Sequence, residues 1–265
     1  MEQISDSDAS HIKHAGLKNL MRNSLSKLGL NLTYALTPGL SAFGLNIFRD
    51  PRPGPLRFRS SYAMDRALKL NPRTVLDVGS GGGVHARQFA EHGCDVVCVD
   101  YGTSVYAEQS VKDGLKIIKT DFNSYEPDQQ FDLVWASHVL EHQRNVGIFI
   151  ERLIACCAAH GTICITVPDP HRYLWGGHVS LWTPGLLAYN IVLCGVDLTN
   201  AVFVRGSGEF SLFFQPVRTA LPADLTFDYL DLDKLAFALP QQWRENGDPW
   251  RVQYECSRSS ERPSD

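Results

Sequence analysis

Short, almost wholly apolar segments alternate through the middle of the chain with segments whose apolar residues recur at helical spacing. Glycines, prolines or polar turns separate each segment from the next. This alternation predicts an α/β fold, in which parallel strands are joined by helices that cover both faces of one sheet. The predicted strands are 74–78, 95–100, 116–120, 131–136 and 162–167, and the predicted helices are 61–70, 84–92, 105–113 and 146–159.

The pattern changes in the last third of the chain. A helix is expected over 181–193, because Thr-Pro near its start is a good helix N-terminus. A β-hairpin is expected over 201–215, with its glycine-containing turn at 205–208. Beyond Pro222 the periodicity weakens, so we expect an irregular segment that ends in disorder from about Ser257.

These patterns divide the chain into three expected parts. Residues 1–59 form an N-terminal helical or lid extension, 60–217 form the α/β domain, and 218–265 form a C-terminal appendage that is partly disordered. Residues 11–32 have apolar positions at helical spacing, which predicts one or two amphipathic helices. Such helices pack on their own domain or serve as a cap or membrane-surface element. Residues 37–59 are rich in Pro and Gly and predict a loop.

The composition of the chain limits which partners and which cellular location we expect. The chain has 265 residues, of which 44% are hydrophobic and 20% charged, enough for the core of one α/β domain with additions. Its net charge of −4 gives no electrostatic footprint for nucleic acid. No apolar run approaches the ~20 residues of a membrane span. Seven cysteines without framework spacing predict free thiols, and no secretion signal is visible, so we expect a cytoplasmic protein.

The most informative motif is the glycine-rich turn 79–83, which follows the first predicted strand. Its glycines let the backbone approach a ligand and direct helix N–H groups toward it. A dinucleotide site would need glycine where Val84 stands, which argues against a nicotinamide dehydrogenase. Asp77 lies in an otherwise apolar strand, which is costly unless its carboxylate is hydrogen-bonded or functional. Asp100 ends the next strand, where it can accept hydrogen bonds from both ribose hydroxyls of a nucleoside.

Together these features resemble the class I S-adenosylmethionine (SAM)-dependent methyltransferases, in particular the type 11 group that includes ubiquinone and menaquinone methyltransferases. The resemblance covers roughly 60–217. It implies a doubly wound, mostly parallel sheet of seven strands in the order 3-2-1-4-5-7-6, with strand 7 antiparallel. The resembling segments are Asp77-x-Gly79-x-Gly81-x-Gly83, Asp100, Asp121-Phe122, Phe131-Asp132-Leu133-Val134-Trp135, His138-Val139-Leu140-Glu141-His142 and His160-Gly161-Thr162-Ile163-Cys164-Ile165, with His160 in place of the family's usual proline.

The resemblance implies that the chain binds SAM and releases S-adenosylhomocysteine (SAH). The glycine turn would hold the methionine part of the cofactor, with Asp77 at its amino group. Asp100 would take the ribose, while Tyr101 and Asp121 would contact the adenine. The full predicted set of cofactor-binding residues is Asp77, Gly79, Ser80, Gly81, Gly83, Asp100, Tyr101, Asp121, Phe122 and Ser137.

Histidines after the fourth and fifth strands are the candidates for catalysis. Methyl transfer to a hydroxyl needs alignment of the reacting groups and a base for the hydroxyl proton, a role that histidine often fills. The two loops carry His138, His142 and His178. If 138–142 begins a helix, His138 and His142 share one face. We expect His142 to be the base, with His178 and then His138 as further candidates and a structural role as the alternative for each.

The segment His138-x-x-Glu141-His142, together with a distant histidine, is also compatible with a divalent metal site. Some small-RNA and quinone methyltransferases bind a metal at a similar Glu-x-x-Glu-His segment. His138 departs from that pattern at its first position, so metal binding stays an alternative and we expect no metal.

We therefore expect methyl transfer to the hydroxyl oxygen of a small-molecule or glycan acceptor. One alternative is methylation of carbon or nitrogen on a quinone or other small ring. Another is a non-catalytic SAM-binding accessory protein. The identity of the acceptor does not follow from the sequence, and neither does the oligomeric state, for which a homodimer is one option.

Overall fold

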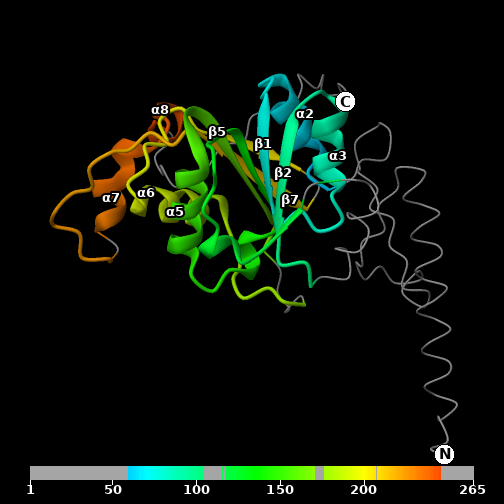
Figure 1. The fold of residues 1–265 in the computed structure, drawn as a ribbon. Coiled ribbons are helices and arrows are strands. Elements are labelled where there is room, and N and C mark those ends of the chain that lie inside the picture. The colour runs from blue at the N-terminus through cyan, green and yellow to red at the C-terminus, as the bar shows by residue number, and fades with distance from the viewer. Residues whose placement is uncertain are drawn as a thin grey trace, which may run out of the picture. The chain divides into compact units, whose positions relative to one another are not determined.

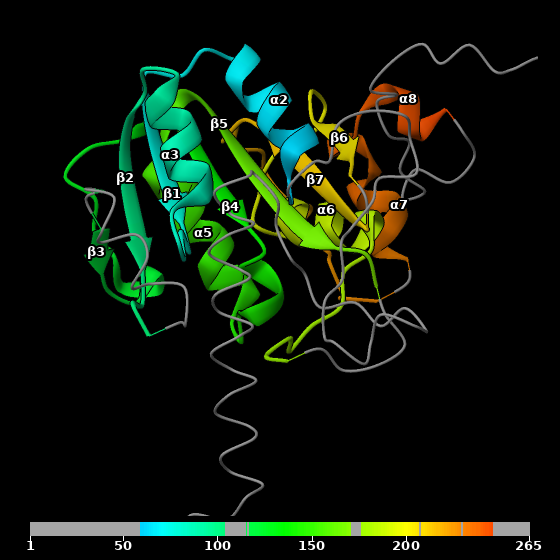
Figure 2. The ribbon, with the colours of Figure 1, turned by 90° about the vertical axis from the view of Figure 1, so that its right-hand side faces the viewer.

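The computed structural model describes residues 59–103, 115, 117–170, 176–206, 208–228 and 230–245. Seven strands form one sheet (Figure 1), and Figure 2 labels all of them in the order β3-β2-β1-β4-β5-β7-β6. Neighbouring strands are parallel except where β7 pairs with β5 and β6. The predicted order and the antiparallel seventh strand are confirmed. The strands are β1 Thr74–Val78, β2 Asp95–Asp100, β3 Ile117–Lys119, β4 Phe131–Ser137, β5 Cys157–Pro168, β6 Val202–Arg205 and β7 Glu209–Phe214.

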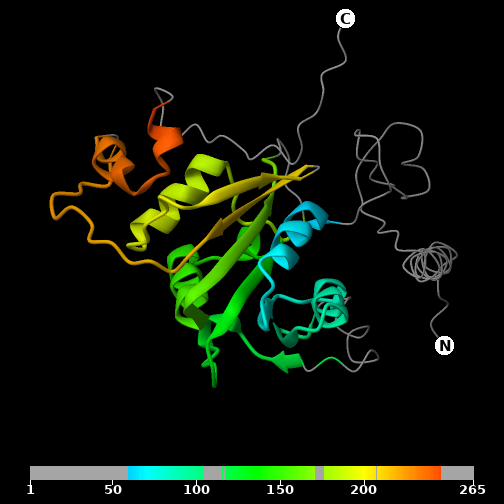
Figure 3. The same ribbon diagram turned by 90° about the horizontal axis from the view of Figure 1, so that it is seen from above.

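Helices cover both faces of this sheet. Figures 2 and 3 show α2 and α3 on one face and α5 and α6 on the other. No helix in the described part of the chain is both long and apolar enough to cross a membrane. The helix predicted at 105–113 and the elements predicted at 11–32 and 37–59 lie outside the described residues, apart from Arg59. The helices are α2 Ser61–Lys69, α3 Val84–Glu91, α5 Val146–Cys156, α6 Pro184–Leu193, α7 Asp231–Leu235 and α8 Gln241–Arg244, with 3₁₀ turns η2 Phe122–Ser124, η3 Leu140–His142 and η4 Ala236–Ala238.

The central strands are apolar because both of their faces are covered. In β1, four successive residues from Val75 to Val78 are buried, and β4 is buried from Leu133 to Ala136. Asp132 is the exposed exception in β4. Its carboxylate accepts hydrogen bonds from the backbone N–H groups of Arg73 and Thr74 at 2.9 and 3.0 Å. It thereby fixes the starts of β1 and β4 side by side.

The prediction of a helix through residue 159 is wrong, because α5 ends at Cys156. Cys157 takes an extended conformation and pairs with Phe131 at the start of β4. Gly161 then passes so close to β4 that a Cβ there would lie 2.8 Å from the carbonyl oxygen of Phe131 and 2.9 Å from that of Asp132. Strand pairing therefore overrides the local helical preference of the alanines before Gly161.

The expectation of irregular structure beyond Pro222 is also wrong over the described residues. Three short helical elements, α7, η4 and α8, follow one another there and bury apolar side chains. The backbone N–H of Leu198 donates to the carbonyl of Ala238 at 2.7 Å, and the ring of Trp243 lies 5.3 Å from that of Phe203 in β6. The segments are too short to give a readable period in the sequence.

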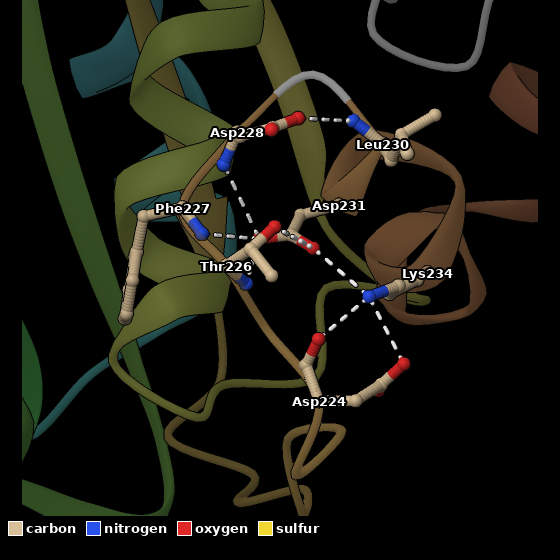
Figure 4. A network of polar contacts seen from close by, with 7 residues as sticks. All are labelled: Asp224, Thr226, Phe227, Asp228, Leu230, Asp231 and Lys234. Atoms are coloured by element: carbon tan, nitrogen blue, oxygen red, sulfur yellow. Dashed lines mark hydrogen bonds and ion pairs between the residues drawn. The ribbon is translucent and has the colours of Figure 1, made fainter.

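A buried carboxylate binds the backbone of the loop that precedes these helices. Asp231, the first residue of α7, accepts hydrogen bonds from the backbone N–H groups of Thr226, Phe227 and Asp228 (Figure 4). Lys234 lies 3.2 Å from Asp231 and 3.0 Å from the carboxylate of Asp224. The loop before α7 is therefore folded around one carboxylate.

Candidate active site

Three glycines in the left-handed region make the turn between β1 and α3. The φ angles are +66° at Gly79, +50° at Gly81 and +69° at Gly83, a region that costs other residues about 1 kcal/mol or more. The N–H of Gly79 donates to the carbonyl of Val99 in β2 at 2.7 Å. A Cβ on Gly79 would lie only 2.5 Å from Cγ2 of Val139. The segment after β4 is thus packed directly on the glycine turn.

Asp77 is buried in β1, two residues before this turn. Its carboxyl group accepts a hydrogen bond from the backbone N–H of Ala86 in α3, while Oδ2 is buried without a partner among the described residues. Burial, with a smaller contribution from Asp100, raises the pKa of Asp77 to about 8. A cationic group bound beside Asp77 would supply the missing partner and favour the carboxylate.

Asp100 ends β2 with its carboxylate directed at two glycine N–H groups. Oδ2 accepts from Gly81 at 2.9 Å, and Oδ1 accepts from Gly102 at 2.7 Å. Each carboxylate oxygen keeps a second lone pair, and the residue is half-buried. Asp100 can therefore hold the glycine turn in place and still accept hydrogen bonds from a ligand.

Asp121, after β3, is linked through polar contacts to the segment after β4. Its Oδ1 accepts from the backbone and side-chain nitrogens of Asn123 at 2.9 and 3.1 Å. Nδ2 of Asn123 also lies 3.3 Å from Oε1 of Gln143, and Nε2 of Gln143 donates to the carbonyl of Val139. Tyr101, whose side chain is exposed, forms a hydrogen bond with Asp121. The edge of the sheet beside the glycine turn therefore carries one connected set of polar groups.

The remaining predicted cofactor residues differ in their exposure. Ser80 lies within the glycine turn, and its carbonyl accepts from the N–H of Gly83 at 2.8 Å. Ser137 is half-buried at the end of β4 and pairs with Thr166. Phe122 is buried, with its ring 5.3 Å from that of Phe149 in α5. The ring of Phe122 thus packs into the core below Asp121.

His138 is held between two buried glutamates. Its Nε2 lies 2.7 Å from Oε2 of Glu209, and its Nδ1 lies 3.3 Å from Oε1 of Glu141. Burial alone would lower the pKa of His138, but contact with Glu141 and Glu209 raises it above its ordinary value. Burial alone would raise the pKa of Glu141, and contact with His138 lowers it. With both ring nitrogens directed at carboxylates, His138 forms an internal ion pair and presents no free nitrogen to an acceptor.

His142 and His178 form a second arrangement beside this ion pair. Their ring centroids are 4.9 Å apart and nearly perpendicular, at 86°. Nδ1 of His142 lies 2.8 Å from the carbonyl oxygen of Gly177, which fixes the orientation of its ring. The carbonyl of Glu141 accepts hydrogen bonds from the N–H groups of Val179 and Ser180 at 2.8 and 3.3 Å. The loop after β5 is therefore fastened to the segment after β4, and this brings the two histidines together.

His138 and His142 would share a face only if a helix began at His138, and the structure has no helix there. His138 takes a left-handed conformation, with φ of +57°, and the 3₁₀ turn η3 begins only at Leu140. The backbone N–H of His138 instead donates to the carbonyl of Thr166 in β5. This conformation directs His138 toward Glu209, while His142 faces Gly177 and His178.

Glu141, His142 and His178 could together hold a metal ion. One ligand atom from each lies within 4.8 Å of the others, and the donors are of the oxygen and nitrogen types that many divalent metals accept. The carboxylate of this group already faces His138, so its negative charge is compensated within the protein.

Sequence reasoning missed two residues of this region. The sequence pattern places Glu209 in a strand and predicts no role for it, although a carboxylate at the start of an otherwise apolar strand is the same signal that indicates a role for Asp77. Val139 carried no chemical signal, and its contact with Gly79 depends on how the two loops pack. Residues 171–175, in the same loop as His178, lie outside the described residues.

Comparison with known proteins identifies the family of this domain. A family model described as a methyltransferase domain matches residues 52–191. The chain is 26% identical over 162 residues to a ubiquinone biosynthesis O-methyltransferase of Stutzerimonas stutzeri (strain A1501), which covers 58% of this chain and 63% of the relative. A protein of the same name from Rickettsia typhi (strain ATCC VR-144 / Wilmington) is 27% identical over 186 residues, covering 66% and 68%. The chain thus spans about two thirds of the length of these relatives.

The fold is also found among solved structures. The structure of a SAM-dependent methyltransferase from Archaeoglobus fulgidus matches with a TM-score of 0.50 and 17% identity, covering 58% of this chain and 91% of that one. The chain belongs to the methyltransferase-domain family, as a class I SAM-dependent methyltransferase.

The residues present fit such a cofactor. The turn allows close approach of a ligand to the backbone, and the unpartnered Oδ2 of Asp77 suits a cationic amino group. The carboxylates of Asp100 and Asp121 end or follow neighbouring strands, β2 and β3, on the ligand edge expected for an open α/β sheet.

Proposed function

We propose that the protein transfers a methyl group from SAM to a hydroxyl oxygen of a small-molecule or glycan acceptor, with His142 as the base. The observation that carries this proposal is the His142–His178 pair. The backbone N–H of His142 donates to the carbonyl of Val139, and the side chain of Val139 packs on Gly79 of the cofactor turn. The relatives named as O-methyltransferases also support oxygen as the acceptor atom.

In this proposal different side chains bind different parts of the cofactor. Asp77 binds the amino group of the cofactor, Asp100 its ribose hydroxyls, and Asp121 with Tyr101 its adenine. When bound, SAM supplies an electrophilic methyl group on a positively charged sulfur. The protein then has to bring the acceptor oxygen into line and keep water away.

His142 is better placed for proton removal than the other histidines. Its Nδ1 faces the carbonyl of Gly177, which selects the tautomer with Nδ1 protonated and leaves Nε2 as the acceptor of a proton. Since it is exposed, it is accessible to a substrate. His178 lies against it and would orient its ring, whereas His138 is occupied by two glutamates.

The acceptor class is tested by a labelled-methyl transfer screen across sugars, phenols, carboxylates and quinones. We expect transfer to a hydroxyl compound. Label that appears on carbon or nitrogen of a ring would favour the alternative chemistry. Tight SAH binding without transfer to any compound would favour the accessory-protein alternative.

The role of His142 is tested with the active acceptor. His142→Ala should lower turnover by roughly 100-fold or more, the usual contribution of a general base, and should leave SAH affinity within about twofold. His160→Ala removes an exposed histidine elsewhere in the chain and should change neither quantity. If His142→Ala turns over at the wild-type rate, the base is another group.

A further inference from the structure

Glu209 is a buried carboxylate in a strand that the cofactor site does not otherwise use. It is the first residue of β7 and pairs with Pro168 at the end of β5. Because β7 runs antiparallel to β5, its beginning lies at the same sheet edge as the ends of the parallel strands. This topology delivers Glu209 to His138, which lies 71 positions earlier in the sequence.

A continuous series of contacts leads from Glu209 to the histidine pair. Oε2 of Glu209 lies 2.7 Å from Nε2 of His138, and Nδ1 of His138 lies 3.3 Å from Glu141. The carbonyl of Glu141 accepts from the N–H groups of Val179 and Ser180, which directly follow His178. His142 directly follows Glu141. His142 and His178 are therefore each adjacent in sequence to a residue of this series, His142 to Glu141 and His178 to Val179.

The hairpin turn is shaped to accommodate the side chain of Glu209. A Cβ on Gly206 would lie 2.5 Å from Cγ of Glu209 and 2.8 Å from its Oε1. The N–H of Gly206 donates to the carbonyl of Glu209 at 2.9 Å. The glycine thus leaves the space in which Glu209 lies as it reaches His138.

We propose that Glu209 is a positioning residue for methyl transfer, which orients the His142–His178 pair through His138 and Glu141. This inference rests on the proposed function of that pair. Glu209 acts at a distance and touches neither the acceptor nor the cofactor. Its removal changes the placement of the histidines and leaves the cofactor residues Asp77 and Asp100 in place.

The test combines kinetics with a spectroscopic readout on the full chain. The ¹Hε1–¹³Cε1 resonances of the histidines are recorded by NMR and assigned with His142→Gln and His178→Gln. Glu209→Ala should displace the resonances of both histidines and lower kcat at least roughly tenfold. The affinity for SAH should stay within about twofold. Glu209→Gln should retain wild-type resonances and most of kcat, because its amide oxygen still accepts a hydrogen bond from His138.

Two further variants control this test. Gly206→Ala leaves the carboxylate present but displaces it, and should reproduce the resonance shifts of Glu209→Ala. Glu151→Ala removes a glutamate of an exposed ion pair with Arg218 and should leave every resonance in place.

The outcomes separate this inference from the proposed function. Unchanged His142 and His178 resonances in folded Glu209→Ala would overturn the positioning role, as would equally displaced resonances in Glu209→Gln. The resonances report on positioning even if no acceptor is methylated. A wild-type protein that does not bind SAH would instead contradict the proposed function. If Glu209→Ala does not fold, Gly206→Ala decides the question, and unchanged His142 and His178 resonances in that variant would overturn the positioning role.

Discussion

The side chain of Val139 packs against Gly79 so closely that a methyl group on the glycine would lie 2.5 Å from Cγ2 of the valine. This contact joins the cofactor side of the site to the segment that carries the histidines. We expect Gly79→Ala to weaken SAH binding at least roughly tenfold, because both the left-handed backbone and Val139 have to move. Isothermal titration calorimetry measures the effect.

Gly93→Ala is the matched control for this substitution. Gly93 also has a left-handed φ, +83°, but a Cβ there would meet nothing within 4 Å. Gly93→Ala therefore introduces backbone strain but no steric clash, and it should leave the affinity for SAH nearly unchanged. Equal effects of the two alanines would mean that the contact with Val139 is unimportant for binding.

Asp100 should be the most sensitive carboxylate for cofactor affinity. Asp100→Ala removes the acceptor for the N–H groups of Gly81 and Gly102 together with the proposed ribose contacts. A loss of roughly 100-fold in SAH affinity corresponds to two such charged hydrogen bonds. Asp95→Asn, at the exposed start of the same strand, should bind as the wild type does. An unaltered dissociation constant for Asp100→Ala would refute the ribose assignment.

Asp77 should make stability depend on pH. Its pKa is about 8 in the folded protein, against 3.8 for an unperturbed carboxyl, so between these values the folded state holds a proton that the unfolded chain releases. The stabilisation is complete in acid and is lost as the pH rises toward 8, by about 1.4 kcal/mol per pH unit. Urea unfolding between pH 5 and 8 should show a flatter dependence for Asp77→Asn. Parallel curves for the two proteins would contradict the raised pKa.

Methyl transfer should proceed without a divalent metal. The carboxylate of Glu141 is already compensated by His138, which reduces its tendency to bind a cation at the Glu141–His142–His178 group. We expect turnover to survive dialysis against EDTA, and mass spectrometry of untagged protein to find less than one metal ion per chain. Activity that is lost with EDTA and restored by magnesium or zinc would show that the group is a metal site.

The C-terminal helices should be sensitive to the charge of Asp231. Burial opposes ionisation, but hydrogen bonds from the N–H groups before α7, beginning with Thr226, and from Lys234 lower the pKa of Asp231 (Figure 4). The stabilisation is therefore present at neutral pH and lost as the pH falls through the lowered pKa. Asp231→Asn should lower the melting temperature by several degrees at pH 7 and by less at pH 3. Asp233→Asn, exposed on the same helix, is the control.

Local sequence patterns located most of the sheet. The bounds of β1 and β2 were predicted without error, because each is an apolar run closed by a glycine or an aspartate. The strand order came from a family resemblance and could not have come from periodicity. The end of α5 was missed because Cys157 is committed to β4 by pairing across the sheet.

The part of the candidate site that could be predicted from the sequence consists of residues at or near the ends of strands. Asp77 is the second-last residue of β1, Asp100 ends β2 and Asp121 follows β3, so all three lie near the edge at which the parallel strands end. The orientation of His138 could not be predicted, because it depends on a left-handed backbone and on Glu209, which is distant in sequence. The sequence places His142 and His178 in the loops after the fourth and fifth strands. Their mutual contact depends on the hydrogen bonds from Val179 and Ser180 to the carbonyl of Glu141, which no local pattern predicts.

The hairpin turn between β6 and β7 also determines the register of β7 in the sheet. Side chains alternate between the two faces of a strand, so a register shift of one residue in β7 would replace Glu209 by Gly208 or Phe210 at the position beside His138, and neither residue carries a carboxylate. The number of residues in this turn therefore specifies which chemical group reaches the histidine. Insertions or deletions between Arg205 and Glu209 should consequently impair turnover even when they preserve the fold and leave every residue around the cofactor unaltered.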